Sequence, residues 1–255
     1  MIQRLSLLST AFAILLAFAA SPAEAGDAAA RRVIGFSPDG GYFAFEQYGV
    51  LDGTESHSGW SEIAIIDTQT DEVIGGKPIL VIEDKKGEAN LKQARAEAAA
   101  QAAPLIAKYS IGARGQRTAA DKSTFPDDMI AAGDIARVEQ ASERLLETVQ
   151  LEQILAGSVK DCSASLDAAQ QGDKTGKALG FRLTLEAPDG APLKVLHEDK
   201  SVPESLNCPT SYSLSEVYEY QQKGKPAVFA VLVQRFSQGH EGPDRRFIAV
   251  TGQVP

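Results

Sequence analysis

A hairpin signature early in the chain constrains the fold more than any other feature. Two runs rich in β-branched and aromatic residues, 33–36 and 42–48, are joined by the sequence Ser-Pro-Asp-Gly-Gly. Pro38 presets its own φ for a tight turn and the two glycines tolerate positive φ, so the runs are expected to pair as antiparallel strands. A third run of this kind, 60–67, extends the prediction to an antiparallel meander over residues 32–75.

The last third of the chain repeats this pattern. The β-prone runs there are 181–186 with 193–196, 216–220 with 228–236, and finally 247–251. The first pair flanks Pro-Asp-Gly-Ala-Pro and the second a short polar segment, and both connections are typical of β-hairpins. We therefore expect a C-terminal β region over residues 144–255.

One segment stands out as helical. Residues 88–108 consist largely of Ala, Lys, Gln, Arg and Glu, which have the highest helix propensities. Ala94, Ala98 and Ala102 recur at a spacing of four and form a face of small side chains, which lets a helix lie close to a sheet. Pro104 is expected to kink or restart the helix near its end.

The remaining segments are less regular. Residues 112–134 are rich in turn formers and are expected to be a loop, whereas the periodicity of residues 136–156 fits a helix or a strand equally well. The combined prediction is a single α+β domain over residues 26–255. It consists mainly of antiparallel β hairpins, with one principal Ala-rich helix packed on a sheet.

The first 25 residues have the features of a Sec-type signal peptide. A basic residue at position 4 precedes an apolar run over 5–20, and Ala23-Glu24-Ala25 supplies the small residues of a cleavage site. The run is shorter than the roughly 20 residues that span a bilayer. We expect cleavage near Ala25-Gly26, no stable membrane insertion afterwards, and a periplasmic or secreted protein.

The cysteine content agrees with export. Cys162 and Cys208 are the two cysteines, too far apart for a redox or zinc motif. In an oxidising compartment two such cysteines usually pair. The predicted disulfide would stabilise the fold by about 4 kcal/mol through the loop that it closes. The alternative is a reactive thiol at Cys208.

The charge excludes one class of partner. The formal net charge is −9, and the basic pairs Arg31-Arg32, Lys85-Lys86 and Arg245-Arg246 are scattered. Binding of nucleic acid requires clustered Lys and Arg side chains that neutralise phosphates. We therefore expect no nucleic acid, and a periplasmic protein or a small ligand as partner.

No motif for cofactor or catalytic chemistry is present. His57, His197 and His240 lie far apart and lack the paired spacing of zinc ligands. The sequence Gly-Phe-Ser-Pro-Asp at 35–39 lacks the final glycine of a nucleophile elbow. We expect no cofactor, no metal and no catalytic residue. A hydrolase with a site assembled from distant histidines and carboxylates is the alternative.

Two loops combine charged, aromatic and histidine side chains. The candidate binding residues are His57 and Trp60 in loop 49–60, and His240, Glu241, Asp244, Arg245 and Arg246 in loop 237–246. If the two hairpins pair in one sheet, these loops lie at the same end and form one binding surface. An arginine there would suit a carboxylate or phosphate group. Alternatively, Arg245 and Arg246 form structural ion pairs at the start of a strand.

Several segments together resemble a known family. Residues 33–49 and 241–250, the stretch Cys-Pro-Thr-Ser-Tyr-Ser at 208–213, and the end of the helical segment at 103–105 resemble a bacterial family of predicted secreted proteins (domain of unknown function 2259). The resemblance implies secretion and carries over no activity, cofactor or catalytic residue. The expected function is a non-catalytic, periplasmic or secreted domain that binds a ligand or partner. The alternatives are the hydrolase above and a structural envelope protein.

Overall fold

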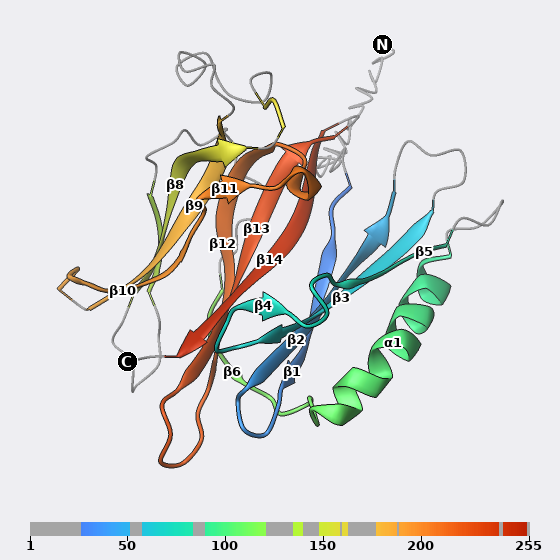
Figure 1. Cartoon of the computed structure of the whole chain (residues 1–255), viewed down its shortest axis with the longest axis horizontal. Helices are drawn as coiled ribbons and strands as arrows, with labels where there is room; N and C mark the ends of the chain where they lie inside the picture. The colour runs from blue at the N-terminus through green and yellow to red at the C-terminus, as the bar shows by residue number, and fades with distance from the viewer. Residues whose placement is uncertain are drawn as a thin grey trace, which may run out of the picture.

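The chain forms an α+β structure dominated by antiparallel strands, as predicted. The structure is a computed structural model and describes residues 27–51, 58–83, 90–120, 135–139, 148–158, 160–162, 177–187, 189–239 and 242–253. Within these residues, three sheets and one helix stack in layers, with one sheet between the other two and the helix on the outside (Figure 1).

The predicted meander forms most of the first layer, which we call the N-terminal sheet. Its strands are β1 (Ala30–Phe36), β2 (Tyr42–Val50), β3 (Gly59–Asp67), β4 (Glu72–Val73) and β5 (Ile79–Glu83). β1, β2 and β3 pair in order, and β4 and β5 both pair with β3. The first turn closes as expected, because the amide of Ser37 donates to the carbonyl of Tyr42 at 2.8 Å. β5 was not anticipated from the sequence.

The helix α1 (Leu91–Lys108) covers one face of this sheet (Figure 1). Its predicted face is confirmed: Ala94, Ala98 and Ala102 are fully buried against β3 and β5. The helix does not restart at Pro104 but continues through it. Proline has no backbone N–H, so one carbonyl in the preceding turn loses its helical hydrogen bond. Because Pro104 is exposed, water can donate a hydrogen bond to that carbonyl instead.

A buried carboxylate fixes the helix on the sheet. Glu46 of β2 is almost completely buried and accepts hydrogen bonds from Arg95 of α1 at 2.8 and 3.0 Å. Arg32 of β1 and the hydroxyl of Ser61 also donate to it. Burial alone would raise the pKa of Glu46, but the hydrogen bonds from the two arginines lower it.

The central sheet is buried on both faces. Its strands, in spatial order, are β14 (Pro243–Gln253), β13 (Val228–Gln238), β12 (Pro209–Tyr220) and β6 (Gln116–Ala120). Along β13, Ala230 and Leu232 face the N-terminal sheet, whereas Val231 and Val233 face the third sheet. Such a strand is apolar at nearly every position. The prediction that residues 112–134 form a loop is wrong for residues 116–120, which form β6 and pair with β12.

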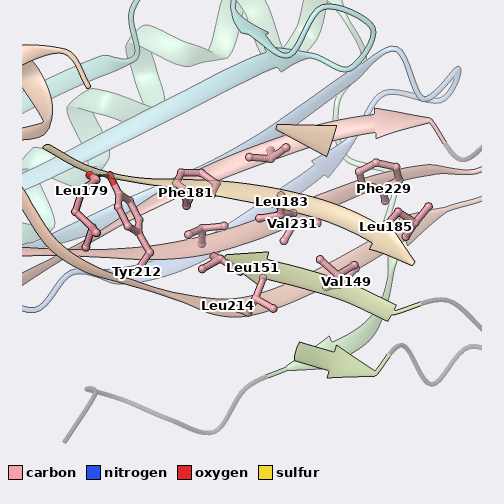
Figure 2. Close-up of a cluster of buried hydrophobic side chains, with 13 residues drawn as sticks. Val149, Leu151, Leu179, Phe181, Leu183, Leu185, Tyr212, Leu214, Phe229 and Val231 are labelled. Carbon is pink, nitrogen blue, oxygen red and sulfur yellow. Dashed lines mark hydrogen bonds between the residues drawn. The ribbon is translucent and has the colours of Figure 1, made fainter. Parts of the chain in front are cut away.

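The outer sheet completes the stack. It contains β10 (Pro192–Glu198), β9 (Lys177–Glu186), β8 (Thr148–Ser158), β7 (Ile135–Glu139) and the short parallel strand β11 (Ser201–Val202). Figure 2 shows the apolar side chains of β8 and β9 packed against those of β12 and β13. The ambiguous segment 136–156 is therefore strand where it is described, because β8 pairs with β7 and β9 through its backbone.

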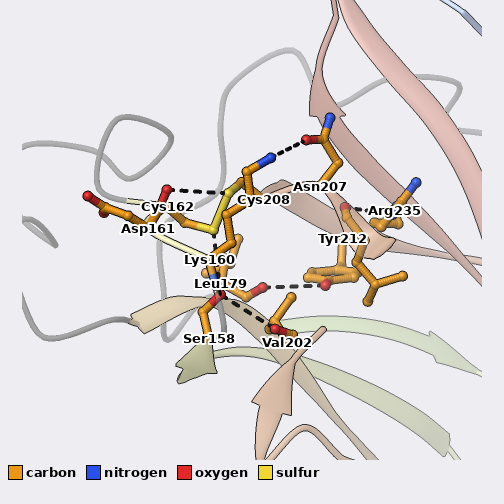
Figure 3. Close-up of a disulfide and its surroundings, with 11 residues drawn as sticks. Ser158, Lys160, Asp161, Cys162, Leu179, Val202, Asn207, Cys208, Tyr212 and Arg235 are labelled. Atoms are coloured by element: carbon orange, nitrogen blue, oxygen red, sulfur yellow. Dashed lines mark hydrogen bonds between the residues drawn. A yellow bond between two sulfur atoms is a disulfide. The ribbon is translucent and has the colours of Figure 1, made fainter. Parts of the chain in front are cut away.

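The disulfide is confirmed. Cys162 and Cys208 are joined, with a Cα–Cα distance of 5.3 Å (Figure 3). The bond links the segment after β8 to the start of β12, next to a short 3₁₀ helix, η2 (Glu204–Leu206). The disulfide therefore connects the outer sheet with the central sheet.

Candidate functional site

A cleft of about 460 Å³ lies between the N-terminal and central sheets. Most of its lining is apolar and comes from β3, β5, β14 and η2. It includes Trp60, Leu80, Ile82, Leu206 and Ala249. Leu80 and Ile82 are 52 and 51% exposed and are among the most exposed large apolar side chains of the described residues. We call this space the inter-sheet cleft.

One end of the inter-sheet cleft is polar. Gln47 of β2 spans the two sheets: its side-chain oxygen accepts from the Phe247 amide at 2.8 Å, and its nitrogen donates to the Phe247 carbonyl at 3.1 Å. The same nitrogen donates to Glu62 at 2.7 Å. Burial raises the pKa of Glu62, against the lowering effect of this hydrogen bond and of nearby arginines.

Arg235 of β13 is the second polar group. Its guanidinium donates from Nη1 to the carbonyl of Leu206 at 2.6 Å, while Nε has no hydrogen-bond partner among the described residues. The side chain is only 8% exposed, and burial lowers the pKa of its guanidinium. An arginine side chain has five N–H donors, and its burial costs free energy unless hydrogen bonds or an ion pair offset the loss of water. The contacts of Arg235 offset this cost only in part.

Trp60 and Arg246 close the same end. The guanidinium of Arg246 lies 4.4 Å from the centre of the Trp60 ring, a cation–π contact. The indole lies over Gly49, where an added Cβ would be 3.1 Å from Nε1. Like Arg235 Nε, Trp60 Nε1 is buried without a hydrogen-bond partner in the described part of the chain. Two buried donors of the lining thus lack acceptors.

The loop hypothesis needs correction. The hairpins do not pair in one sheet: β2 and β3 belong to the N-terminal sheet, and β13 and β14 to the central sheet. Residues 243–246 are not in a loop but begin β14. The ends of the hairpins nevertheless meet, because the two sheets pack face to face and bring Arg246 over Trp60.

The candidate residues divide into three groups. Trp60 and Arg246 line the inter-sheet cleft, whereas His57, His240 and Glu241 lie outside the described residues. Asp244 and Arg245 bind the N-terminal segment instead: Asp244 accepts from the amide of residue 27 at 3.0 Å, and Arg245 donates to the carbonyl of residue 29 at 3.2 Å. Arg246 also contacts Asp27, with 3.5 Å between Nη2 and Oδ2.

Sequence reasoning missed Gln47, Glu62 and Arg235. A signal was present for Arg235, which stands in the apolar strand predicted over 228–236. A charged residue in such a strand is rarely fully buried without a partner or a function. Gln47 and Glu62 carried no local signal, because their roles depend on which sheet faces which.

His197 forms a separate polar cluster. Its Nε2 lies 3.0 Å from Oδ1 of Asp199, its Nδ1 lies 4.0 Å from Oδ2 of Asp71, and its ring stacks on Phe181. Asp71 also accepts from the amide and hydroxyl of Thr251. The cluster joins all three sheets. In the described ranges, no group of three or more His, Cys, Asp or Glu residues has a geometry that could hold a metal ion.

Comparison with known proteins bears on the chain as a whole. A family model described as predicted secreted protein, domain of unknown function 2259, matches residues 44–253. The chain belongs to this family. The resemblance inferred from the sequence is confirmed, and all the residues that line the inter-sheet cleft lie within the matched range. No curated protein and no solved structure gives a significant match. Across the described residues, no helix has the length and apolarity to cross a bilayer.

Proposed function

We propose that the protein is an exported, non-catalytic binding protein that holds a small apolar ligand in the inter-sheet cleft. The observation that carries the proposal is the cleft itself, whose apolar lining ends in a few polar groups. Small-molecule sites are typically concave, mostly apolar and roughly 300–1,000 Å³ in volume, with a few polar groups that orient the ligand. The volume suits a single small molecule.

The exposed part of the lining supports this proposal. Leu80 and Ile82 of β5 stand beside the cleft with about half of their surface in water. A bound apolar molecule would remove this surface from water, which contributes about 25 cal/mol per Å². The favourable free energy of binding would thus come mainly from apolar burial.

A neutral fluorescent probe tests the proposal directly. Trp60 is the sole tryptophan of the chain and lines the cleft, so a bound N-phenyl-1-naphthylamine molecule should quench its emission by energy transfer. Ala249→Phe would place a large ring in the space and should weaken probe binding at least about tenfold, since it removes the volume that the ligand needs. Fluorescence titration measures both effects.

The matched control is Ala100→Phe on the exposed face of α1, away from the cleft. It should bind the probe as the unmodified protein does. Melting curves establish that both variants are folded. A probe that does not bind the unmodified protein, or binds both variants equally well, would contradict the proposal.

Export is the second part of the proposal, supported by family membership and by the signal-peptide features of residues 1–25. Protein isolated from the periplasm of an expressing bacterium is expected to begin at or near Gly26, because Ala23 and Ala25 are the small residues that signal peptidase requires. Intact-mass analysis checks this. Recovery of protein that retains Met1 would refute cleavage.

A further inference from the structure

The chemical class of the ligand can be inferred from Arg235. This residue lines the inter-sheet cleft and is more than nine-tenths buried. Among the described residues it makes one hydrogen bond, to the neutral carbonyl of Leu206. It makes no ion pair within 4.0 Å with any described carboxylate. Glu62 and Asp244 attract this charge without touching it. A buried charge that lacks a counter-ion in direct contact is costly, and the cost falls when an anion binds.

The neighbouring charges already have partners. Arg246 contacts Asp27 and the face of Trp60, and Glu62 accepts from the side-chain nitrogen of Gln47. Among the described residues that line the cleft, Arg235 is thus the cation that makes no ion pair within 4.0 Å, and an anionic ligand would supply one. Glu62 also limits the charge of that ligand, because a dianion would be repelled more strongly than a monoanion.

The hydrogen-bonding geometry favours a planar acceptor. Nη1 is used by Leu206, and Nε is free of partners in the described part of the structure. Nε and Nη2 form one edge of the guanidinium, and two parallel N–H groups along such an edge match the two oxygens of a carboxylate.

We propose that the ligand is a monocarboxylate with an apolar tail, of the fatty-acid class. Its carboxylate accepts hydrogen bonds from Arg235, and its tail lies along the apolar lining that includes Leu80 and Ile82. This inference rests on the proposed function, since it assumes that the inter-sheet cleft is the binding site.

The test compares ligands that share a tail and differ in the head group. Decanoate, decanol, decylamine and decyl phosphate are titrated against the probe-loaded protein at neutral pH, below the concentrations at which they form micelles. Decanoate should bind at least about tenfold more tightly than decanol, because a hydrogen bond between charged groups in a buried site is stronger than one to a neutral hydroxyl. Decylamine should bind more weakly than decanol, because its charge repels Arg235.

The outcomes separate the two proposals. If decanol displaces the probe as well as decanoate does, the carboxylate inference is overturned while the binding function stands. If decyl phosphate binds more tightly than decanoate, the monocarboxylate assignment is likewise overturned. If the protein binds neither the probe nor any of the four ligands, the proposed function itself fails.

A variant assigns the preference to Arg235. Arg235→Met should abolish the advantage of decanoate over decanol. Arg182→Met, which removes a partly exposed arginine from the outer sheet, is the matched control and should keep the advantage. Because Arg235 also binds Leu206, Arg235→Lys serves as a second variant that keeps the charge and loses the planar edge. It should show a reduced preference. An undiminished preference in Arg235→Met or Arg235→Lys would overturn the assignment.

Discussion

Replacement of Phe36 by alanine is expected to lower the free energy of unfolding by about 3–5 kcal/mol, the usual cost of removing a buried aromatic ring. Phe36 ends β1 and is completely buried. Its ring packs against Phe43 and Tyr220, with ring centres 4.8 and 5.3 Å away, so it touches both the N-terminal and the central sheets. Collapse of the site is restricted, since the adjoining strands are fixed by backbone hydrogen bonds.

The backbone around Phe36 explains why the cavity would persist. The Phe36 amide donates to the carbonyl of Ala113 at 2.9 Å, and its carbonyl accepts from Gly112 and Ala113. These bonds do not depend on the ring and hold the chain in place after truncation. Urea unfolding measures the change. Leu193→Ala, at a residue 48% exposed on β10, is the control and should have a far smaller effect. Equal effects of the two substitutions would contradict the packing described here.

Loss of the disulfide is expected to have an effect of similar size. Replacing Cys162 and Cys208 together by serine opens a loop of 46 residues, which on the chain-entropy model costs about 4 kcal/mol. Other contacts at this junction survive, among them the hydrogen bond from Lys160 to Asn207 at 3.1 Å (Figure 3). We therefore expect a folded variant with a much lower melting temperature.

The reductant response distinguishes this effect from a packing defect. The melting temperature of the unmodified protein should fall towards that of the double variant when dithiothreitol is added, whereas the variant should not respond. Thiol labelling of the denatured, unreduced protein should find no free cysteine. Two free thiols in material from an oxidising compartment would refute the bond and restore the reactive-cysteine alternative.

Local chemistry made the hairpins predictable. The turn after β1 depends on Pro38 and on Gly40, which has a φ of 73°, and both residues lie within a few positions of the strands they join. The same holds for Gly190 between β9 and β10, with a φ of 82°. The alanine face of α1 could be predicted because residues four positions apart lie on the same face of a helix.

Arrangements between sheets could not be predicted in this way. The sequence predicts one hairpin from the strands at 216–220 and 228–236. Their local sequence does not show that the sheet they belong to is covered on both faces. The cleft follows from that stacking, since Gln47 and Phe247 are 200 residues apart when they bond. Residues 136–156 remained ambiguous because their apolar spacing fits both a helix and a strand, and only the pairing of β8 with β7 and β9 decides between them.

The central sheet also has a consequence for the order in which the protein can fold. Three of its strands, β12, β13 and β14, come from the last part of the chain, yet they cover the apolar faces of both neighbouring sheets. A chain that emerges N-terminus first, from the ribosome or through an export channel, exposes those faces until β12, β13 and β14 have emerged and can pack on them. Contacts so distant in sequence form slowly, and exposed apolar strands invite aggregation. Stable folding must therefore wait for the C-terminus, and a chain truncated before β12 would present two uncovered sheets to chaperones and proteases.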